Sequence, residues 1–407
     1  MTYLAVFVVA LCGALVGTPL ARRTALRYDI VDHPDPGGRK AHAAPMPYLG
    51  GLAIYVAFMV FLFVALLDKR ASGTPLWQGV GIVAGATLMV GFGLVDDRFS
   101  LPPLLKMGGQ VLAAALLYVA GVHFHFNHFS WLDAPVSIIW VVGMTNAFNL
   151  LDNMDGLSVG TAAIGCAYFF VLALLEPYNK QFLVAIMAVA LLGACLGFLY
   201  YNFNPARIFM GDAGSLFLGF MLSVLGLKIN NMNNGFPNLH AVNFFVPIVV
   251  LGIPIFDTTL VTISRLRRHV PVSRGGRDHT SHRLVLLGLT VREAVMTVYL
   301  AAGALGLAAI LLTIARRPVS GGILVALVVA IGGVAGYMLE KVYRRSLATS
   351  YQPAAISSQR SAISGQPLAK DSPVPEIASL SVPTAPQDIA AAGAPLSGKA
   401  RTHKSKS

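Results

Sequence analysis

Four short polar segments combine carboxylates, carboxamides and basic side chains, and each lies beside a long apolar run. Carboxylate and amide oxygens are ligands for Mg²⁺, and Arg and His side chains can bind a multiply charged phosphate. Ionisable groups at the rim of a membrane are energetically unfavourable and usually mark function. We therefore expect the chemistry to lie in Asp96-Asp97, residues 146–156, residues 204–215 and residues 274–283.

The paired acids Asp96 and Asp97 end an apolar run. If that run is a helix, both carboxylates stand at the negative end of its dipole, where anions are disfavoured. A cationic partner should therefore offset their charge, and a bound metal ion is one such partner. The alternative is a solvated turn that Arg98 and Lys106 neutralise.

The second segment carries Asn146, Asn149 and Asp152 at three-residue intervals, followed by Asp155-Gly156. On a helix this spacing places the first three side chains on one polar stripe of an otherwise apolar span. Polar groups within lipid need partners, so we expect the stripe to face a site inside the protein. The alternative is hydrogen bonding that only ties neighbouring helices together.

The third segment places Asp212 at the start of another apolar run, between Gly211 and Gly214. Free N–H groups and the helix dipole make a helix N-terminus a binding place for anions. A carboxylate there can hold Mg²⁺ while the N–H groups hold phosphate. The alternative is an ordinary N-cap aspartate.

The fourth segment is basic and contains Arg277, His279, His282 and Arg283 beside two glycines. Its side chains can clamp a phosphate, and the alternative is a loop that is basic only because it lies on the inner side. A zinc site is not expected here, because the histidines lack the spacing of zinc ligands. For a separate histidine run at residues 123–128 we expect a polar loop cap, with a metal site as the alternative.

The composition indicates a polytopic membrane protein, because apolar residues make up 56% of the 407-residue chain and charged residues only 12%. The formal net charge of +12 has no compact basic domain to carry it, so we expect no nucleic-acid partner. We predict an all-α membrane helix bundle with about 11 transmembrane helices. The expected spans are residues 2–20, 48–67, 76–95, 103–122, 134–151, 157–176, 181–200, 213–229, 241–262, 293–315 and 321–340.

The basic residues predict the orientation of these spans. Arg22 and Arg23 follow the first span, which places the N-terminus outside and the C-terminus in the cytoplasm. Most other Lys and Arg residues then fall in inner loops, and all four polar segments reach the same inner side. We expect one membrane domain over residues 1–345 and a disordered cytoplasmic tail over residues 346–407.

Taken in order, the four segments resemble the motifs of the polyprenyl-phosphate N-acetylhexosamine-1-phosphate transferases, of the glycosyltransferase family 4 type. The chain is similar to undecaprenyl-phosphate GlcNAc-1-phosphate transferases and, more distantly, to phospho-MurNAc-pentapeptide translocase, over residues 1–345. It departs from the family pattern at Ser100, which replaces an acid, and at Ser281, which replaces a histidine. The first inner loop adds further matching residues, namely Asp32, Pro34, Arg39, Lys40, His42, Pro45, Pro47, Gly50 and Gly51.

The resemblance implies transfer of N-acetylhexosamine 1-phosphate, with GlcNAc the expected sugar, from a UDP-sugar to undecaprenyl phosphate, with release of UMP. It implies that Asp212 and Asn149 hold Mg²⁺, with Mn²⁺ as an alternative ion. It also implies that Phe209 stacks on uracil and that Asp155 contacts it. The expected catalytic residues are Asp96, Asp97 and Asp152, and the expected phosphate-binding residues are Lys40, Arg277, His279, His282 and Arg283.

We expect the reaction at the cytoplasmic face of a bacterial inner membrane, as the first membrane step of an envelope polysaccharide such as lipopolysaccharide. The lipid bilayer is then a partner, while a homodimer, the exact sugar and a covalent aspartyl intermediate stay open. A secondary transporter of an anionic solute and transfer of phospho-MurNAc-pentapeptide remain as alternatives. A CDP-alcohol-type phosphatidyltransferase would need a further motif after Asp155-Gly156, which the sequence lacks.

Overall fold

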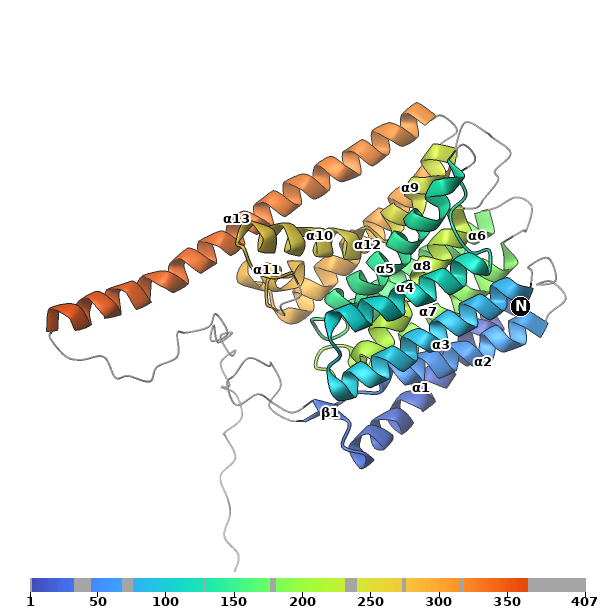
Figure 1. Ribbon diagram of the computed structural model, residues 1–407, viewed down its shortest axis with the longest axis horizontal. Coiled ribbons are helices and arrows are strands. Elements are labelled where there is room, and N and C mark those ends of the chain that lie inside the picture. Colours follow the sequence, from blue (N-terminus) through green and yellow to red (C-terminus); the bar gives the residue numbers. More distant parts are fainter. Residues whose placement is uncertain are drawn as a thin grey trace, which may run out of the picture.

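The computed structural model describes residues 2–32, 45–67, 76–126, 129–175, 181–230, 240–272, 276–314 and 318–364. These residues form a bundle of α-helices and one two-stranded antiparallel sheet (Figure 1). The predicted all-α fold is therefore confirmed. The elements are α1 (Thr2–Arg27), β1 (Val31–Asp32), β2 (Met46–Pro47), α2 (Gly50–Leu67), α3 (Leu76–Phe99), α4 (Pro103–Val119), α5 (Asp133–Leu151), α6 (Leu157–Leu175), α7 (Phe182–Asn202), α8 (Gly211–Asn230), α9 (His240–Val250), α10 (Gly252–Arg267), α11 (Thr280–Leu286), α12 (Val291–Ile314) and α13 (Pro318–Ser364).

Within the described residues, 8 helices are long and apolar enough to cross a membrane, or 9 spans if the bent pair α9–α10 counts as one. Two shorter apolar helices are Gly50–Val60, within α2, and α4. Every apolar run predicted from the sequence coincides with one of these helices, except residues 241–262, which coincide with the bent pair α9–α10. The chain is a polytopic, all-helical membrane protein, whereas the number of about 11 spans and the side of each terminus stay predictions.

The prediction of one continuous span over residues 241–262 is wrong. The described part of this run is broken into α9 and α10, which meet at 75°. Pro247 lies inside α9, and Gly252 begins α10. Proline and glycine are both usual causes of sharp kinks. The break turns α10 so that its Asp257 contacts the basic segment that precedes α11.

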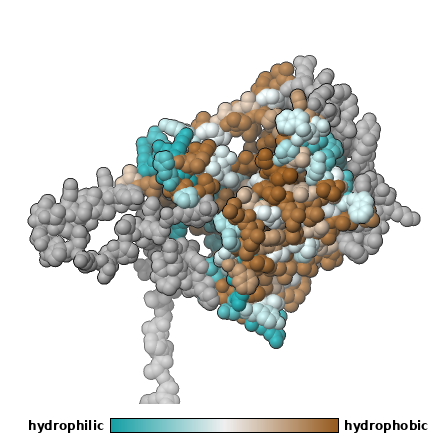
Figure 2. All heavy atoms as spheres, viewed as in Figure 1, coloured by the Kyte–Doolittle hydropathy of each residue, from teal (hydrophilic) through white to brown (hydrophobic). Residues whose placement is uncertain are grey.

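Helix α13 is longer than we expected and faces outward. It continues to Ser364, although we expected a disordered tail from residue 346, and residues 365–407 lie outside the described part of the chain. Only 6% of the most apolar part of Val319–Ala348 is buried inside the protein. Hydrophobic residues also cover much of the face seen in Figure 2. An apolar exterior of this kind is typical of helices that are surrounded by lipid.

Helix α8 lies at the centre of the bundle and packs against α2, α3, α5 and α6. Small residues let its first turn fit between α2 and α3. A Cβ on Gly51 would lie 2.2 Å from the Cα of Gly214, and a Cβ on Gly93 would lie 2.3 Å from the Cα of Ala213. This close crossing brings the C-terminal end of α3, with Asp97, against the N-terminus of α8.

Candidate active site

Asp97 caps the N-terminus of α8 from a neighbouring helix. Its Oδ1 accepts the backbone N–H of Asp212 at 2.7 Å, and its Oδ2 accepts that of Ala213 at 3.2 Å. Gly211 has a positive φ of 73°, and a Cβ there would lie 2.7 Å from Asp97 Oδ2. The positive end of the α8 dipole therefore offsets the Asp97 charge. These two N–H groups donate to Asp97 in the structure, and phosphate binding by them stays a prediction.

Lys106 supplies the cation for the other paired acid. Its ammonium group lies between Asp96, which it contacts most closely, and Asp212 Oδ2 at 2.6 Å. Asp96 Oδ1 also accepts the backbone N–H of Leu101 at 2.6 Å. The alternative in which Lys106 neutralises the acids is confirmed, but the turn is not simply solvated, because Asp96 is only 7% exposed. Lys106 connects the end of α3 to the start of α8.

The residues of the polar stripe on α5 have two roles: Asn146 connects helices, and Asn149 belongs to the candidate active site. The side chains of Asn146 and Gln110 exchange two hydrogen bonds, of 2.6 and 3.2 Å, and so tie α5 to α4. Asn149 instead donates to Asp212 Oδ1 at 2.7 Å and to Ser215 Oγ at 2.9 Å. The structure thus brings Asn149 and Asp212 together, and interhelical hydrogen bonding accounts for Asn146.

Asp152, which directly follows α5, presents a carboxylate to the same group of residues. It is half-buried, and no hydrogen bond to its carboxylate comes from the described residues. Burial, as the largest cause, and the negative charges of Asp212, Asp97 and Asp155 together raise the pKa of Asp152 to about 8. Of the predicted catalytic acids, Asp152 is therefore the one whose oxygens are available.

The predicted uridine-binding residues lie on two segments that meet, with Asp155 in the turn between α5 and α6 and Phe209 on the segment that leads into α8. Asp155 Oδ2 accepts hydrogen bonds from Asn204 Nδ2 at 3.0 Å and from the backbone N–H of Ala206 at 2.9 Å. Phe209 is half-buried, and its ring centroid lies 6.1 Å from that of Tyr48. Asp155 thus holds the loop that positions Phe209, while uracil contact by either side chain stays a prediction.

Asp257 and Ser281 attach the basic segment to the site. Asp257 Oδ2 pairs with His279 Nδ1 at 2.8 Å, and its Oδ1 accepts the backbone N–H of Thr280 at 2.6 Å. Ser281 Oγ donates to Asn153 Oδ1 at 2.7 Å. The start of α11 is therefore tied both to α10 and to the turn that carries Asp152. Ser281, which replaces a family histidine, makes the second of these contacts.

Arg283 holds the basic segment against α13. Its side chain is fully buried and pairs with Glu340 Oε2 at 2.6 Å, and its Nε donates to the Asp278 carbonyl at 2.8 Å. Its guanidinium also lies over the Tyr343 ring, 4.7 Å from the centroid. A guanidinium buried among these partners joins α11 to α13. Its Nη2 has no hydrogen-bond partner among the described residues, and the phosphate-binding role predicted for Arg283 stays a prediction.

His282 is not a source of positive charge at neutral pH. Burial, as the largest cause, and the positive charges of His279 and Arg277 together lower its pKa to about 4. Its Nδ1 is buried without a hydrogen-bond partner among the described residues. A neutral imidazole can donate a hydrogen bond to a ligand or accept one from it, but it cannot neutralise the charge of a phosphate. Arg277 is exposed and remains able to reach an anion, whereas Lys40 lies outside the described residues.

Our reasoning from the sequence did not include Lys106 or Tyr48 among the site residues. Burial and the nearby charges of Asp32, Asp97 and Asp212 raise the pKa of Tyr48, which places this phenol beside the acids. Both residues have a signal in the sequence. Lys106 follows the paired acids as the family pattern expects, and Tyr48 lies within the matched first inner loop.

The oxygen atoms that could act as metal ligands in this site fit Mg²⁺ or Mn²⁺. Asp212 Oδ1 and the Asn149 carboxamide are adjacent, and Asp152 adds a carboxylate without hydrogen-bond partners among the described residues. Hard oxygen ligands of this type are the ones that Mg²⁺ prefers. In the structure the Lys106 ammonium group occupies the other oxygen of Asp212, which indicates that this carboxylate lies where positive charge is favourable.

Comparison with known proteins agrees with this arrangement. Residues 79–230 match the family described as Glycosyl transferase family 4. The chain is 33% identical over 315 residues to the probable undecaprenyl-phosphate N-acetylglucosaminyl 1-phosphate transferase of Bacillus subtilis (strain 168), covering 75% of this chain and 84% of the relative.

Two further relatives carry related names. The chain is 32% identical over 314 residues to the decaprenyl-phosphate N-acetylglucosaminephosphotransferase of Mycobacterium leprae (strain TN), covering 71% of this chain and 77% of the relative. It is 26% identical over 299 residues to the undecaprenyl-phosphate alpha-N-acetylglucosaminyl 1-phosphate transferase of Escherichia coli (strain K12), covering 70% and 77%.

The fold and the site define a polytopic membrane protein with its acidic residues gathered at one end of the helical bundle. With the matched family and the identity to the Bacillus subtilis relative, the chain belongs to glycosyl transferase family 4.

Proposed function

We propose that the protein transfers GlcNAc-1-phosphate from UDP-GlcNAc to a polyprenyl phosphate, expected to be undecaprenyl phosphate, and releases UMP. The observation that carries this proposal is the contact between Asn149 and Asp212, next to Asp97 and Asp152, at one end of an apolar helical bundle. A soluble nucleotide sugar and a lipid-borne phosphate can meet only at the membrane surface. The basic inner loops favour the cytoplasmic face of a bacterial inner membrane for this site.

Asp212 and Asn149 would hold Mg²⁺, or Mn²⁺ as an alternative. When bound, the ion would supply positive charge that neutralises the donor diphosphate and stabilises the UMP that leaves. The exposed side chain of Arg277 would add positive charge from the protein itself.

Asp152 would accept the proton of the lipid phosphate or orient that phosphate for attack. Asp96 is engaged by Lys106 and Leu101, and Asp97 by two backbone N–H groups, so neither offers a free carboxylate. An oxygen of the lipid phosphate would attack the phosphorus that bears the sugar. The bond from that phosphorus to the bridging oxygen would break, and UMP would depart with the bridging oxygen. Holding both anions in line is the main contribution that the protein makes to such a transfer.

Phe209 and Asp155 would bind the uracil of the donor. An aromatic face offers stacking to a base, and Asp155 keeps one oxygen, Oδ1, outside the two hydrogen bonds that its Oδ2 accepts. Asp155 holds the segment that enters α8, on which Phe209 lies, so a bound uracil would be close to the Asp212 end of that helix.

The test uses the purified chain in nanodiscs with Mg²⁺ and undecaprenyl phosphate, and follows UMP release from UDP-GlcNAc, UDP-GalNAc and UDP-MurNAc-pentapeptide. We expect turnover with UDP-GlcNAc that requires the lipid phosphate and is lost in Asp152→Asn. Asp29→Asn is a matched control, because Asp29 is exposed and has a positive φ of 54°, which Asn tolerates. Turnover with only the pentapeptide donor would contradict the sugar assignment, and solute uptake into proteoliposomes without UMP release would favour a transporter.

A further inference from the structure

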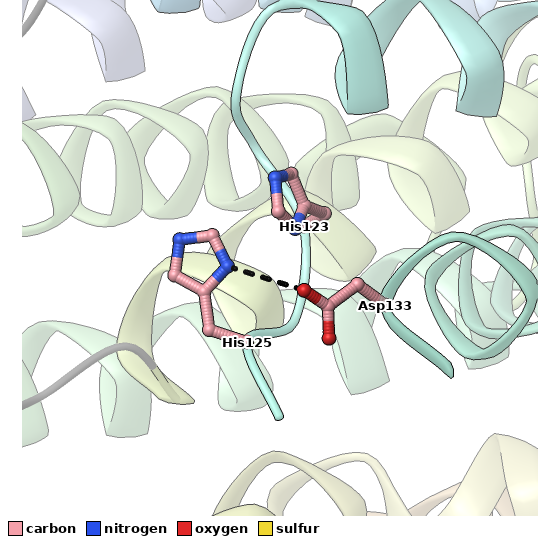
Figure 3. Close-up of side chains that lie close together, drawn as sticks. All are labelled: His123, His125 and Asp133. Atoms are coloured by element: carbon pink, nitrogen blue, oxygen red, sulfur yellow. Dashed lines mark ion pairs between the residues drawn. The ribbon is translucent and has the colours of Figure 1, made fainter. Parts of the chain in front are cut away.

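A second group of ligand-bearing side chains lies between α4 and α5. One ligand atom from each of His123, His125 and Asp133 lies within 4.8 Å of those from the other two (Figure 3). The histidines come from the loop after α4, and Asp133 is the first residue of α5. His128, which belongs to the same histidine run, lies outside the described residues.

This cluster is separate from the candidate active site. Helix α5 has 19 residues and extends from Asp133 to Leu151, directly before Asp152. At 1.5 Å per residue the helix is about 28 Å long, which is close to the thickness of a hydrocarbon core. The cluster and the acidic site therefore lie at opposite ends of one membrane-spanning helix.

His123 and Asp133 each make a hydrogen bond of the kind that usually orients a metal ligand. His123 Nδ1 lies 2.8 Å from the Phe124 carbonyl, and since a carbonyl only accepts, Nδ1 carries the proton and Nε2 carries the lone pair. Asp133 Oδ1 accepts the backbone N–H of Phe126 at 2.8 Å. A histidine that donates its other nitrogen to a carbonyl, and a carboxylate fixed by a hydrogen bond, are typical partners around a metal ion.

The loop that carries the histidines is anchored to the bundle. Phe124 is fully buried, and its backbone N–H donates to Ser137 Oγ at 2.9 Å. The rings of Phe124 and Phe126 both pack against Phe244 of α9, at centroid distances of 5.2 and 5.8 Å. A rigid backbone of this kind reduces the entropy that is lost when the side chains close on a ligand.

The remaining distances leave space for an ion. His125 Nδ1 is 3.9 Å from Asp133 Oδ2, at the outer limit of an ion pair, and the two imidazole centroids are 4.3 Å apart. The His125 side chain is 55% exposed and can adjust.

We propose that His123, His125 and Asp133 form a zinc site, with water as a further ligand, that fastens the α4–α5 loop to the start of α5. Two imidazoles and one carboxylate suit Zn²⁺, which binds nitrogen at about 2.0–2.1 Å and carboxylate oxygen at about 2.0–2.2 Å. Mg²⁺ prefers oxygen ligands alone, so the two ends of α5 would select different metals.

The test uses the full chain, purified without a histidine tag, in nanodiscs. We expect wild type to bind one Zn²⁺ more tightly than His125→Gln and Asp133→Asn, by at least the 10–100-fold that loss of an outer-shell partner causes. Co²⁺ should give the visible absorption of a tetrahedral site in wild type and in Asp212→Asn, and excess Mg²⁺ should not remove it. His269→Asn is the matched control, because His269 is exposed and its positive φ of 55° suits Asn.

Thermal unfolding gives a second measurement that does not depend on stoichiometry. Zn²⁺ that binds only the folded state raises the unfolding temperature, so the rise should occur in wild type and His269→Asn. It should be absent in Asp133→Asn, in which an amide oxygen can still accept the Phe126 N–H. Equal Zn²⁺ affinity, or an equal rise in unfolding temperature, in wild type and both cluster variants would overturn the proposal.

Discussion

The substitution Asp97→Asn tests whether Asp97 acts as the cap of helix α8 or as the catalytic base. In the structure the Asp97 carboxylate accepts the N–H groups of Asp212 and Ala213, one with each oxygen. An asparagine has one acceptor oxygen, so one N–H loses its partner and faces an NH₂ group. We therefore expect this variant to lose stability at the N-terminus of α8, and to lose activity because Asp212 lies on that turn.

The magnitude follows from the two interactions that are lost. A hydrogen bond to a charged group contributes about 1.5–3 kcal/mol, and a charge near a helix N-terminus contributes about 0.3–1 kcal/mol. Since asparagine keeps one of the two hydrogen bonds, we expect the free energy of unfolding to fall by about 2–3 kcal/mol. If the same free energy appears in the activation barrier through a displaced Asp212, UMP release slows about 30–150-fold.

The assay measures UMP release and thermal unfolding of the same preparations, with Asp152→Asn beside Asp97→Asn. The Asp152 carboxylate lacks a hydrogen-bond partner among the described residues, so Asp152→Asn should keep wild-type stability. It should lose turnover by about 10²–10⁴-fold, which is typical for removal of a general base. The reasoning is refuted if Asp97→Asn unfolds like wild type while its turnover collapses, because Asp97 would then be the base.

Three further predictions concern the metal, the donor and the pH. Asp212→Asn should remain in the membrane yet lose Mg²⁺-dependent UMP release, and undiminished turnover would contradict its role as a ligand. Phe209→Ala should raise the KM for UDP-GlcNAc by about 5–150-fold with a smaller change in kcat, since base stacking contributes about 1–3 kcal/mol, and an unchanged KM would argue against stacking. The pKa of His282 is lowered from 6.5 to about 4 in the folded state. As the pH falls, the imidazole is therefore protonated in the unfolded chain before it is protonated in the folded protein, which favours unfolding. Stability should therefore drop by about 2 kcal/mol between pH 7 and pH 5, and His282→Gln should remove that part of the drop, whereas His269→Asn should not.

The resemblance to the family predicted the pairing of Asn149 with Asp212, whereas the place of each residue on its own helix has a local cause. Asn149 follows from three-residue spacing on a helix, and Asp212 from its place at the start of an apolar run. Composition predicted the helices themselves, since a chain with 56% apolar residues needs lipid around its apolar surface, and within lipid a helix satisfies its own backbone polar groups. These inferences need no knowledge of which helices are neighbours.

The parts that could not be predicted depend on contacts between distant segments. Asp97 and the N–H of Asp212 are 115 positions apart, and nothing near either residue indicates that one caps the other. Arg283 has the sequence context of a phosphate clamp, yet Glu340 and Tyr343 of the last helix bury it. The residues around Arg283 would be the same whether its guanidinium bound a ligand or, as in the structure, paired with Glu340, which is 57 positions away.

The arrangement of the acids explains why so many carboxylates can gather at one end of the bundle. Each of three carboxylates has a partner: Asp97 accepts the N–H groups at the N-terminus of α8, Lys106 lies between Asp96 and Asp212, and Asn149 also donates to Asp212. Only Asp152 lacks a compensating hydrogen bond among the described residues, and a further cation or a proton would relieve its repulsion with the others. A site with three compensated carboxylates is ordered before the substrates bind, and because the pKa of Asp152 is raised to about 8, this group has a high affinity for the proton of the acceptor phosphate.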